Sequence, residues 1–325
     1  MTRVWRAAPV AAALLAAGCS GGGTAVSTSP VTTTGPTPSA TAVAAPTQPP
    51  AGVSPPATGP SPPHVMLIVL ENREYSAVIG SSSAPYLNQL ANRYGLATQA
   101  YATGHPSLPN YLELIAGTTF GISSDCTGCS VDGPTVTDQL DTVGVGWRAY
   151  MESMPSPCFT GAASDGYAKK HDPFVYVRHL RDGADCVRVV PFGQLATDLG
   201  SGRAAPFLWV TPNLCNDGHD CGIGQVDHWL HSVLTMVQGS GWYRQGGAVI
   251  ITWDEGGSSA GCCQTARGGH VATIVVSAAT APGSRLDRPV DQAGILRTLE
   301  QLYRLPFLGD AACPCSGDLL PLLGR

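Results

Sequence analysis

The chain carries little charge. Asp, Glu, Lys and Arg make up only 13% of its 325 residues, and the formal net charge is −5. With 43% apolar residues, this composition excludes a disordered protein and provides for one large core, which we expect to fold as a single α/β domain and a monomer. An acidic chain without a basic stripe offers phosphate backbones little to bind, so we expect no nucleic-acid partner. After the N-terminal segment, no apolar run approaches the ~20 residues that span a membrane.

The N-terminus has the pattern of an export signal. Arg3 and Arg6 precede an apolar stretch over residues 7–15, and small residues follow it up to Cys19. Residues 15–19 also resemble a bacterial lipobox, so we predict a lipoprotein signal peptide over residues 1–19 and lipidation at Cys19. The protein is then extracytoplasmic and held on the cell membrane by its lipid; a plain secretory signal is the alternative and makes it secreted.

Residues 20–63 contain no acidic or basic side chain and consist mostly of Ser, Thr, Pro, Gly, Ala and Val. Such a stretch buries too little apolar surface to offset its ordering entropy. We therefore predict a disordered tether over 20–63 and a catalytic domain over 64–325.

Ten cysteines follow Cys19, an even number that favours disulfides in an exported chain. Two short spacings also fit a zinc or redox site, which is the less favoured interpretation in an oxidising compartment. Three pairs are close enough in the sequence to be candidates: Cys126 with Cys129, Cys215 with Cys221, and Cys313 with Cys315.

Strands and helices alternate along the rest of the chain. Unbroken apolar runs at 64–70 and 248–253 are typical of strands covered on both faces. Further strands are predicted over 146–150, 187–190, 206–211 and 271–277, and a turn at Gly95. Helices are predicted over 84–94, 108–116, 135–142, 192–199, 223–237 and 291–302. This alternation predicts a mostly parallel central sheet with helices on both faces.

Two polar doublets end the two apolar runs: Glu71-Asn72 and Asp254-Glu255. In parallel sheets the ligand crevice lies at the carboxyl ends of the strands. Three carboxylates and an amide oxygen gathered there would need a counter-charge. The sequence therefore predicts a site for one divalent cation.

Three further polar segments can carry chemistry. In the first, Ser107 stands at the start of a helix, where an anion is favoured, with His105 and Asn110 close by; an ordinary helix cap is the alternative. The second contains Asn213, Asp217 and His219 after a predicted strand, and fits either phosphate binding or a turn pinned by a disulfide. The third places His270 after two glycines at the sheet edge.

Together these motifs resemble the phosphoesterase family of bacterial phospholipases C and acid phosphatases, in the alkaline-phosphatase-like superfamily. The resemblance implies an alkaline-phosphatase-like fold and a serine nucleophile, best placed at Ser107, with Asn110 contacting phosphate. It implies one metal with the following ligands: Glu71, Asn72, Ser107, Asp254 and Glu255. His219 and His270 fall where two-metal relatives hold a second metal.

The ligand set is rich in oxygen, which suits Ca²⁺, Mg²⁺ or Mn²⁺ better than Zn²⁺. We therefore expect a metal-dependent hydrolase of phosphate esters, of the acid phosphatase type. His219 and His270 would stabilise phosphoryl charge, and His105 or His219 would protonate the leaving oxygen. Asn213 and Asp217 would help to bind substrate. The alternatives are a phospholipase C-type phosphodiesterase and, outside enzymes, a surface lipoprotein that binds phosphate without turnover.

Overall fold

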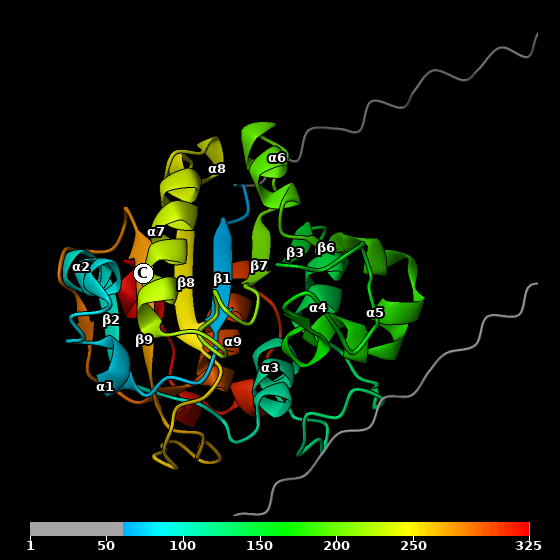
Figure 1. The fold of residues 1–325 in the computed structure, drawn as a ribbon, viewed down its shortest axis with the longest axis horizontal. Coiled ribbons are helices and arrows are strands. Elements are labelled where there is room, and N and C mark those ends of the chain that lie inside the picture. The colour runs from blue at the N-terminus through cyan, green and yellow to red at the C-terminus, as the bar shows by residue number, and fades with distance from the viewer. Residues whose placement is uncertain (1–60, 325) are drawn as a thin grey trace, which may run out of the picture. The chain divides into compact units, whose positions relative to one another are not determined.

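The computed structural model describes residues 61–324, and one sheet of nine strands runs through this part of the chain. Its strand order is β10-β2-β9-β8-β1-β7-β3-β6, with β11 paired to β2. The order from β2 to β6 can be followed in Figure 1. The bounds are β1 Val65–Leu70, β2 Gly95–Tyr101, β3 Trp147–Met151, β6 Val189–Pro191, β7 Phe207–Thr211, β8 Ala248–Trp253, β9 His270–Ser277, β10 Arg285–Leu286 and β11 Val290–Asp291. A small separate hairpin joins β4 (Ala163–Ser164) to β5 (Tyr167–Ala168).

The centre of the sheet is parallel. β1 lies between β7 and β8 and runs parallel to both, with every residue of β1 buried. β9 is the exception, because it runs antiparallel to both β8 and β2. The predicted fold class, a mostly parallel sheet within an α/β domain, is confirmed.

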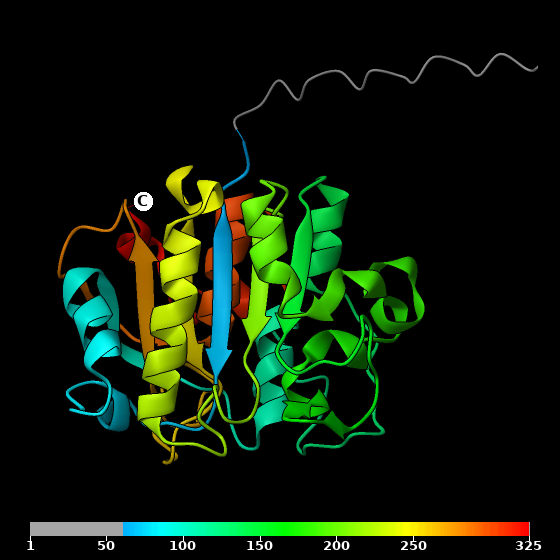
Figure 2. The ribbon, with the colours of Figure 1, turned by 45° about the horizontal axis from the view of Figure 1, so that its top comes forward.

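Helices cover both faces of the sheet, as Figure 2 shows. One layer contains α2 (Pro85–Arg93), α6 (Gln194–Gly200), α7 (Ile223–Gln238) and α8 (Gly241–Arg244). The other contains α3 (Ser107–Ala116), α4 (Val136–Thr142) and α9 (Gln292–Tyr303). Two short helices, α1 (Tyr75–Val78) and α5 (Arg178–Asp182), lie toward the edges. Six 3-10 turns complete the fold: Lys169–His171, Pro173–Tyr176, Ala184–Arg188, Gly309–Ala312, Pro314–Ser316 and Leu320–Leu323.

Two features of the sheet depart from the sequence prediction. The turn expected at Gly95 is wrong, because Gly95 is the first residue of strand β2. Sequence reasoning missed this strand because the segment Gly-Leu-Ala-Thr-Gln-Ala-Tyr has few β-branched residues. The strand expected over 187–190 begins two residues later, because a 3-10 turn continues to Arg188.

Disulfides pair all ten cysteines of residues 61–324. The three predicted pairs are present, which leaves no thiol among them for a zinc site. The two pairs that sequence reasoning did not identify are Cys158 with Cys186, and Cys262 with Cys263.

The predicted signal peptide with Cys19, and the tether up to residue 60, lie outside the described residues. Residues 61–63, at the end of the predicted tether, have no regular secondary structure. Within residues 61–324, no helix combines the length and the apolar character needed to cross a bilayer.

Candidate active site

The two strand-end doublets lie side by side. Leu70 and Trp253, the last residues of β1 and β8, are partners in the parallel register, so Glu71 and Asp254 follow at the same edge of the sheet. The N–H of Asp254 donates to the Leu70 carbonyl over 2.8 Å, which continues the strand pairing by one residue. Both Glu71 and Asp254 are fully buried, and Glu255 is nearly so.

Ser107 points at this pair of doublets. It is buried in the first turn of α3, and its hydroxyl donates to Glu71 Oε2 over 3.1 Å. The residue at the cap position is Pro106, and no side chain caps the helix. The alternative interpretation of Ser107 as an ordinary helix cap is therefore wrong.

The Glu71 carboxylate is held from several sides. One turn after Ser107, the Tyr111 hydroxyl donates to Glu71 Oε1. His171 Nε2 lies 3.2 Å from Glu71 Oε2, and His171 Nδ1 lies 3.3 Å from Asp217 Oδ2, so this buried ring bridges two carboxylates. Glu71, His171 and Asp217 together form a compact group whose possible metal-ligand atoms lie within 4.8 Å of one another.

Charge explains how these buried groups tolerate one another. Burial alone would lower the pKa of His171, but Glu71 and Asp217 raise it to about 9. Burial would raise the pKa of Glu71, but His171 holds it below the usual value. The pKa of Asp254 is instead raised well above its usual value by burial and by the neighbouring charges of Glu71 and Glu255. Asp254 is thus the carboxyl that lacks a counter-charge.

Three side-chain oxygens, one each from Asn72, Asp254 and Glu255, lie close together. The side-chain oxygen of Asn72 lies 3.3 Å from Asp254 Oδ1 and 2.9 Å from Glu255 Oε1, with no donor between them in this amide orientation. Asp254 Oδ2 is buried and has no hydrogen-bond partner among residues 61–324. Either the amide of Asn72 is turned over, so that its nitrogen donates to both carboxylates, or the three oxygens surround a cation.

His105 lies at the more exposed side of the site. Its Nδ1 is 2.7 Å from Glu255 Oε2, and its Nε2 is 3.0 Å from the Ser258 carbonyl. The side chain is 40% exposed, so it can meet both the buried carboxylates and solvent. Burial raises the pKa of Glu255, although the His105 contact opposes this change.

Asn110 fastens the loop that precedes Ser107. Its side chain accepts from the Gly104 N–H over 2.8 Å and donates to the carbonyls of Gly104 and Pro106. Both ends of the amide are therefore engaged with the backbone. These contacts position the loop that carries His105 and Ser107.

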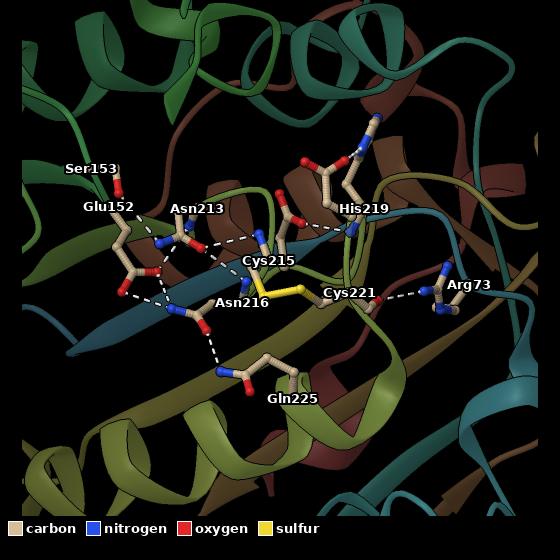
Figure 3. The surroundings of a disulfide bond; sticks show 11 residues. Arg73, Glu152, Ser153, Asn213, Cys215, Asn216, His219, Cys221 and Gln225 are labelled. Carbon is tan, nitrogen blue, oxygen red and sulfur yellow. Dashed lines mark hydrogen bonds and ion pairs between the residues drawn. A yellow bond between two sulfur atoms is a disulfide. The ribbon is translucent and has the colours of Figure 1, made fainter. Parts of the chain in front are cut away.

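Two residues of the loop after β7 have different roles, and Figure 3 shows the contacts of the first, Asn213. Asn213 accepts from the N–H groups of Cys215 and Asn216 and faces Glu152 and Ser153, as expected of a turn pinned by the Cys215–Cys221 disulfide. Asp217 instead turns into the site, and its backbone carbonyl accepts from the Glu71 N–H over 3.0 Å. Asn213 therefore supports the loop, and Asp217 belongs to the buried cluster.

Of the two other histidines predicted for the site, His219 and His270, only His219 lies with the cluster. Its ring centroid is 5.8 Å from that of His171, and its backbone N–H donates to Asp217 Oδ1 over 2.7 Å. His270 stacks between Tyr75 and Tyr101, and its Nε2 is 2.9 Å from the Thr98 carbonyl. The structure thus does not bring the His270 ring against Ser107.

Sequence reasoning missed several residues of the site. His171 and Lys170 come from a 3-10 turn, Tyr111 from inside α3, and Glu74 from the segment after Asn72. Glu74 accepts from the N–H groups of Gly257, Ser258 and His270, and so fastens the loop after Glu255. One signal was available, because Lys169 and Lys170 are the only lysines in the whole chain.

The chain is similar in sequence to known phosphoesterases and phosphatases. The family model described as the phosphoesterase family matches residues 81–306. The chain is 32% identical to a phosphatidylinositol-3-phosphatase of Mycobacterium tuberculosis over 252 residues, which are 76% of this chain and 79% of that protein. It is 29% identical to an acid phosphatase of Aspergillus fumigatus over 58% of this chain and 44% of that one.

Solved structures agree with the fold. A protein of the alkaline phosphatase superfamily from Vibrio parahaemolyticus superposes with a TM-score of 0.52 at 15% identity, over 80% of this chain and 72% of that one. A phosphonate monoester hydrolase of Agrobacterium radiobacter gives 0.52 at 14% identity, over 81% and 77%. At these identities the likeness concerns the fold alone.

Proposed function

Because this chain belongs to the phosphoesterase family and is a hydrolase of phosphate esters, we propose that it cleaves phosphate monoesters with Ser107 as the nucleophile. The observation that carries this proposal is the hydrogen bond from the Ser107 hydroxyl to Glu71, beside Asp254 at the ends of two adjacent parallel strands. The relatives named above are phosphatases, which favours a monoesterase over the phospholipase C type.

A divalent cation fits the oxygens that meet beside Asp254. Neighbouring ligands of a hard cation bound at about 2.1–2.6 Å are themselves about 3.0–3.7 Å apart. The contacts of Asn72 with Asp254 and Glu255, at 3.3 and 2.9 Å, are close to this spacing. Asn72, Asp254 and Glu255 would hold the cation, with Glu71 next to them in the group that it forms with His171 and Asp217. The oxygens of this set support Ca²⁺, Mg²⁺ or Mn²⁺ over Zn²⁺.

The group of Glu71, His171 and Asp217 is less suited to a metal. Both ring nitrogens of His171 already face carboxylate oxygens, at 3.2 and 3.3 Å. These two carboxylates raise the pKa of His171 to about 9, and a protonated ring carries a proton on each nitrogen and has no free lone pair for a ligand bond. We infer that His171 neutralises Glu71 and Asp217 rather than binding the cation.

The chain's own residues account for the positioning of the reaction. Glu71 accepts the Ser107 hydrogen bond, and Tyr111 and His171 in turn hold Glu71 in place. When bound, the cation would supply positive charge that favours the ionised Ser107 hydroxyl and stabilises the phosphoryl oxygens. The first turn of α3 adds little to this stabilisation, because the Leu108 N–H already donates to Asp125 and Pro109 has no N–H.

The reaction then proceeds in two steps. The Ser107 hydroxyl passes its proton to Glu71, and its oxygen bonds to phosphorus as the bond from phosphorus to the leaving oxygen breaks. His105 or His219 gives the leaving oxygen a proton. Water next gives a proton to that histidine and attacks phosphorus, the bond to Ser107 breaks, Ser107 takes its proton back from Glu71, and inorganic phosphate is released. His105 touches Glu255 and is exposed on its other side, which suits a proton donor at the entrance.

A single substitution tests the nucleophile. We expect Ser107→Ala to abolish turnover of a chromogenic phosphomonoester while metal content, measured by elemental analysis, stays unchanged. Ser232→Ala, on the exposed side of α7, is the matched control. Unchanged turnover in Ser107→Ala would remove this residue from the mechanism. Tight phosphate binding without turnover by the wild type would instead favour the non-catalytic lipoprotein.

A substrate panel tests the ester class. The wild type should turn over a phosphomonoester faster than a phosphate bis-ester or phosphatidylcholine. The reverse order would make it a phosphodiesterase of the phospholipase C type.

We also propose that the protein acts outside the cytoplasm, anchored through Cys19. The five disulfides support an oxidising compartment. Metabolic labelling with a radioactive fatty acid tests the anchor, since Cys19→Ser should abolish incorporation. Labelling that persists in this variant would contradict the proposal.

A further inference from the structure

Lysine is almost absent from this chain. Of 18 basic residues, 16 are arginine, and the two lysines, Lys169 and Lys170, directly precede His171. We propose that Lys170 binds the phosphoryl group of the substrate and makes the site selective for dianionic monoesters. This inference rests on the proposed function, whose substrate class it narrows.

Lys170 is held over the buried cluster by contacts on two sides. Its Nζ lies 3.0 Å from Asp125 Oδ2 and 3.3 Å from His219 Nε2. The other Asp125 oxygen accepts from the N–H of Leu108 over 3.0 Å. Asp125 thus ties the ammonium to the first turn of α3, directly beside the residue proposed as the nucleophile.

Lys170 lies nearer to solvent than the neighbouring His171. His171 is buried against Glu71, whereas the Lys170 side chain remains 21% exposed. Lys170 therefore stands between solvent and the carboxylates. An ammonium has three N–H donors, and contacts with the described residues occupy two of its directions. A phosphoryl oxygen can take the third.

The adjacent Lys169 has a different and purely structural environment. Its Nζ donates to the Thr127 carbonyl over 2.7 Å and lies 4.7 Å from the ring centroid of Tyr176. Only 5% of the residue is exposed. The two lysines thus provide an internal comparison between a partly exposed amine and a buried one.

The negative charge of the site explains why the Lys170 ammonium is needed in addition to the divalent cation. Glu71, Asp254 and Glu255 repel an anion that approaches Ser107, and the proposed divalent cation offsets only part of their charge. A monoester carries up to two negative charges near neutral pH, and a diester carries one. A fixed ammonium at the entrance therefore attracts the monoester more strongly.

Kinetics of charge-matched variants test the inference. For a chromogenic monoester, we expect Lys170→Ala to lower kcat/KM by about 10- to 100-fold, and Lys170→Arg to restore part of it. For a diester with the same leaving group, the loss should stay within about threefold, and inorganic phosphate should inhibit the monoester reaction correspondingly less. Arg178→Ala removes a cation that pairs with Asp132 on an exposed surface, and should alter neither reaction.

Amine labelling gives a readout that does not depend on turnover. Reductive methylation of the metal-loaded enzyme should modify Lys170 and spare Lys169, and inorganic phosphate should protect Lys170. The inference fails if phosphate gives no protection, or if Lys170→Ala lowers both ester activities equally. Failure of the proposed function looks different, because the wild type would then lack monoesterase activity or Ser107→Ala would retain it.

Discussion

The backbone N–H of Asn72 donates to Asp254 Oδ1 over 3.0 Å, and this bond joins the two strand-end doublets directly. It depends on an unusual backbone conformation, since Asn72 has a φ of 47° in the left-handed region. Asparagine tolerates this region better than most residues. The chain therefore turns sharply after Glu71, and both the amide N–H and the side chain of Asn72 face the carboxylates of the neighbouring strand.

Asp254→Asn should separate the two roles of this carboxylate. The substitution removes a proposed cation ligand, so bound metal and activity should both fall strongly. It also removes a buried carboxylate that repels Glu71 and Glu255. In a chelator, the variant should therefore unfold at the same temperature as the wild type or higher, whereas added metal should stabilise only the wild type. Elemental analysis and thermal denaturation with and without chelator measure both effects. Full metal content in the variant would contradict the ligand assignment.

Tyr111→Phe should weaken the support of Glu71. The change deletes one donor to a buried carboxylate and leaves the ring in place. We expect a loss of about 1–3 kcal/mol in the free energy of unfolding, because the acceptor stays buried. Activity should fall at least several-fold, since Glu71 also orients Ser107. Urea denaturation and steady-state kinetics check the two effects, and a fully active variant would show that Tyr111 does not position Glu71.

Buried acids should make stability depend on pH. Burial, with the charges of Asp310 and Asp291, raises the pKa of Glu113 from 4.5 to about 8. Burial also raises the pKa of Glu300 to about 8. Each group stays protonated in the folded protein up to about pH 8 but ionises near pH 4.5 when unfolded. Its stabilisation is therefore complete below pH 4.5 and is lost as the pH rises to 8.

Glu113→Gln tests this sign. Between pH 5 and pH 8 the free energy of unfolding of the wild type should fall by at least about 2 kcal/mol, and the variant should show a smaller fall. Asp165→Asn, at an exposed turn, is the control and should follow the wild type. Chemical denaturation at several pH values provides the measurement. A variant with the full wild-type slope would exclude Glu113 as a source.

The disulfides should differ in their effect on stability according to the loops they close. Cys158 and Cys186 are 28 residues apart, whereas Cys126 and Cys129 are only three apart. Replacing the first pair by serine should cost about 3–4 kcal/mol, and replacing the second about 1–2 kcal/mol. Denaturation of the two double variants under identical conditions compares them. A larger loss of unfolding free energy for the Cys126–Cys129 pair would show that the entropy of the unfolded chain is not the main source of disulfide stabilisation.

Much of the site could be predicted from the sequence because it follows the ends of buried strands. The runs that form β1 and β8 have no polar interruption, so their ends and the doublets that follow are clear. Parallel pairing then brings Glu71 and Asp254 together without any knowledge of the helices. The same reasoning located Asp217 after β7.

The rest of the site could not be predicted because it depends on tertiary contacts. His171 lies in a short 3-10 turn with no periodic pattern, and Tyr111 is indistinguishable in sequence from a core aromatic of α3. The strand β2 was missed for a related reason, since its small residues carry little β-propensity. Asn110 and Asn213 are of a residue type that often binds ligands, but in the fold their side chains form hydrogen bonds with the backbone of their own loops.

The reversed direction of β9 gives the segment between Asp254 and His270 two anchors on one rim. β8 ends at that rim and β9 begins there, so the chain leaves the sheet and returns to it within a single hairpin connection. Insertions or deletions between these anchors would change the connection whose Ser258 carbonyl contacts His105, and would leave the strand register untouched. The entrance to the site can therefore change in size while the strand ends before Glu71 and Asp254 stay in place.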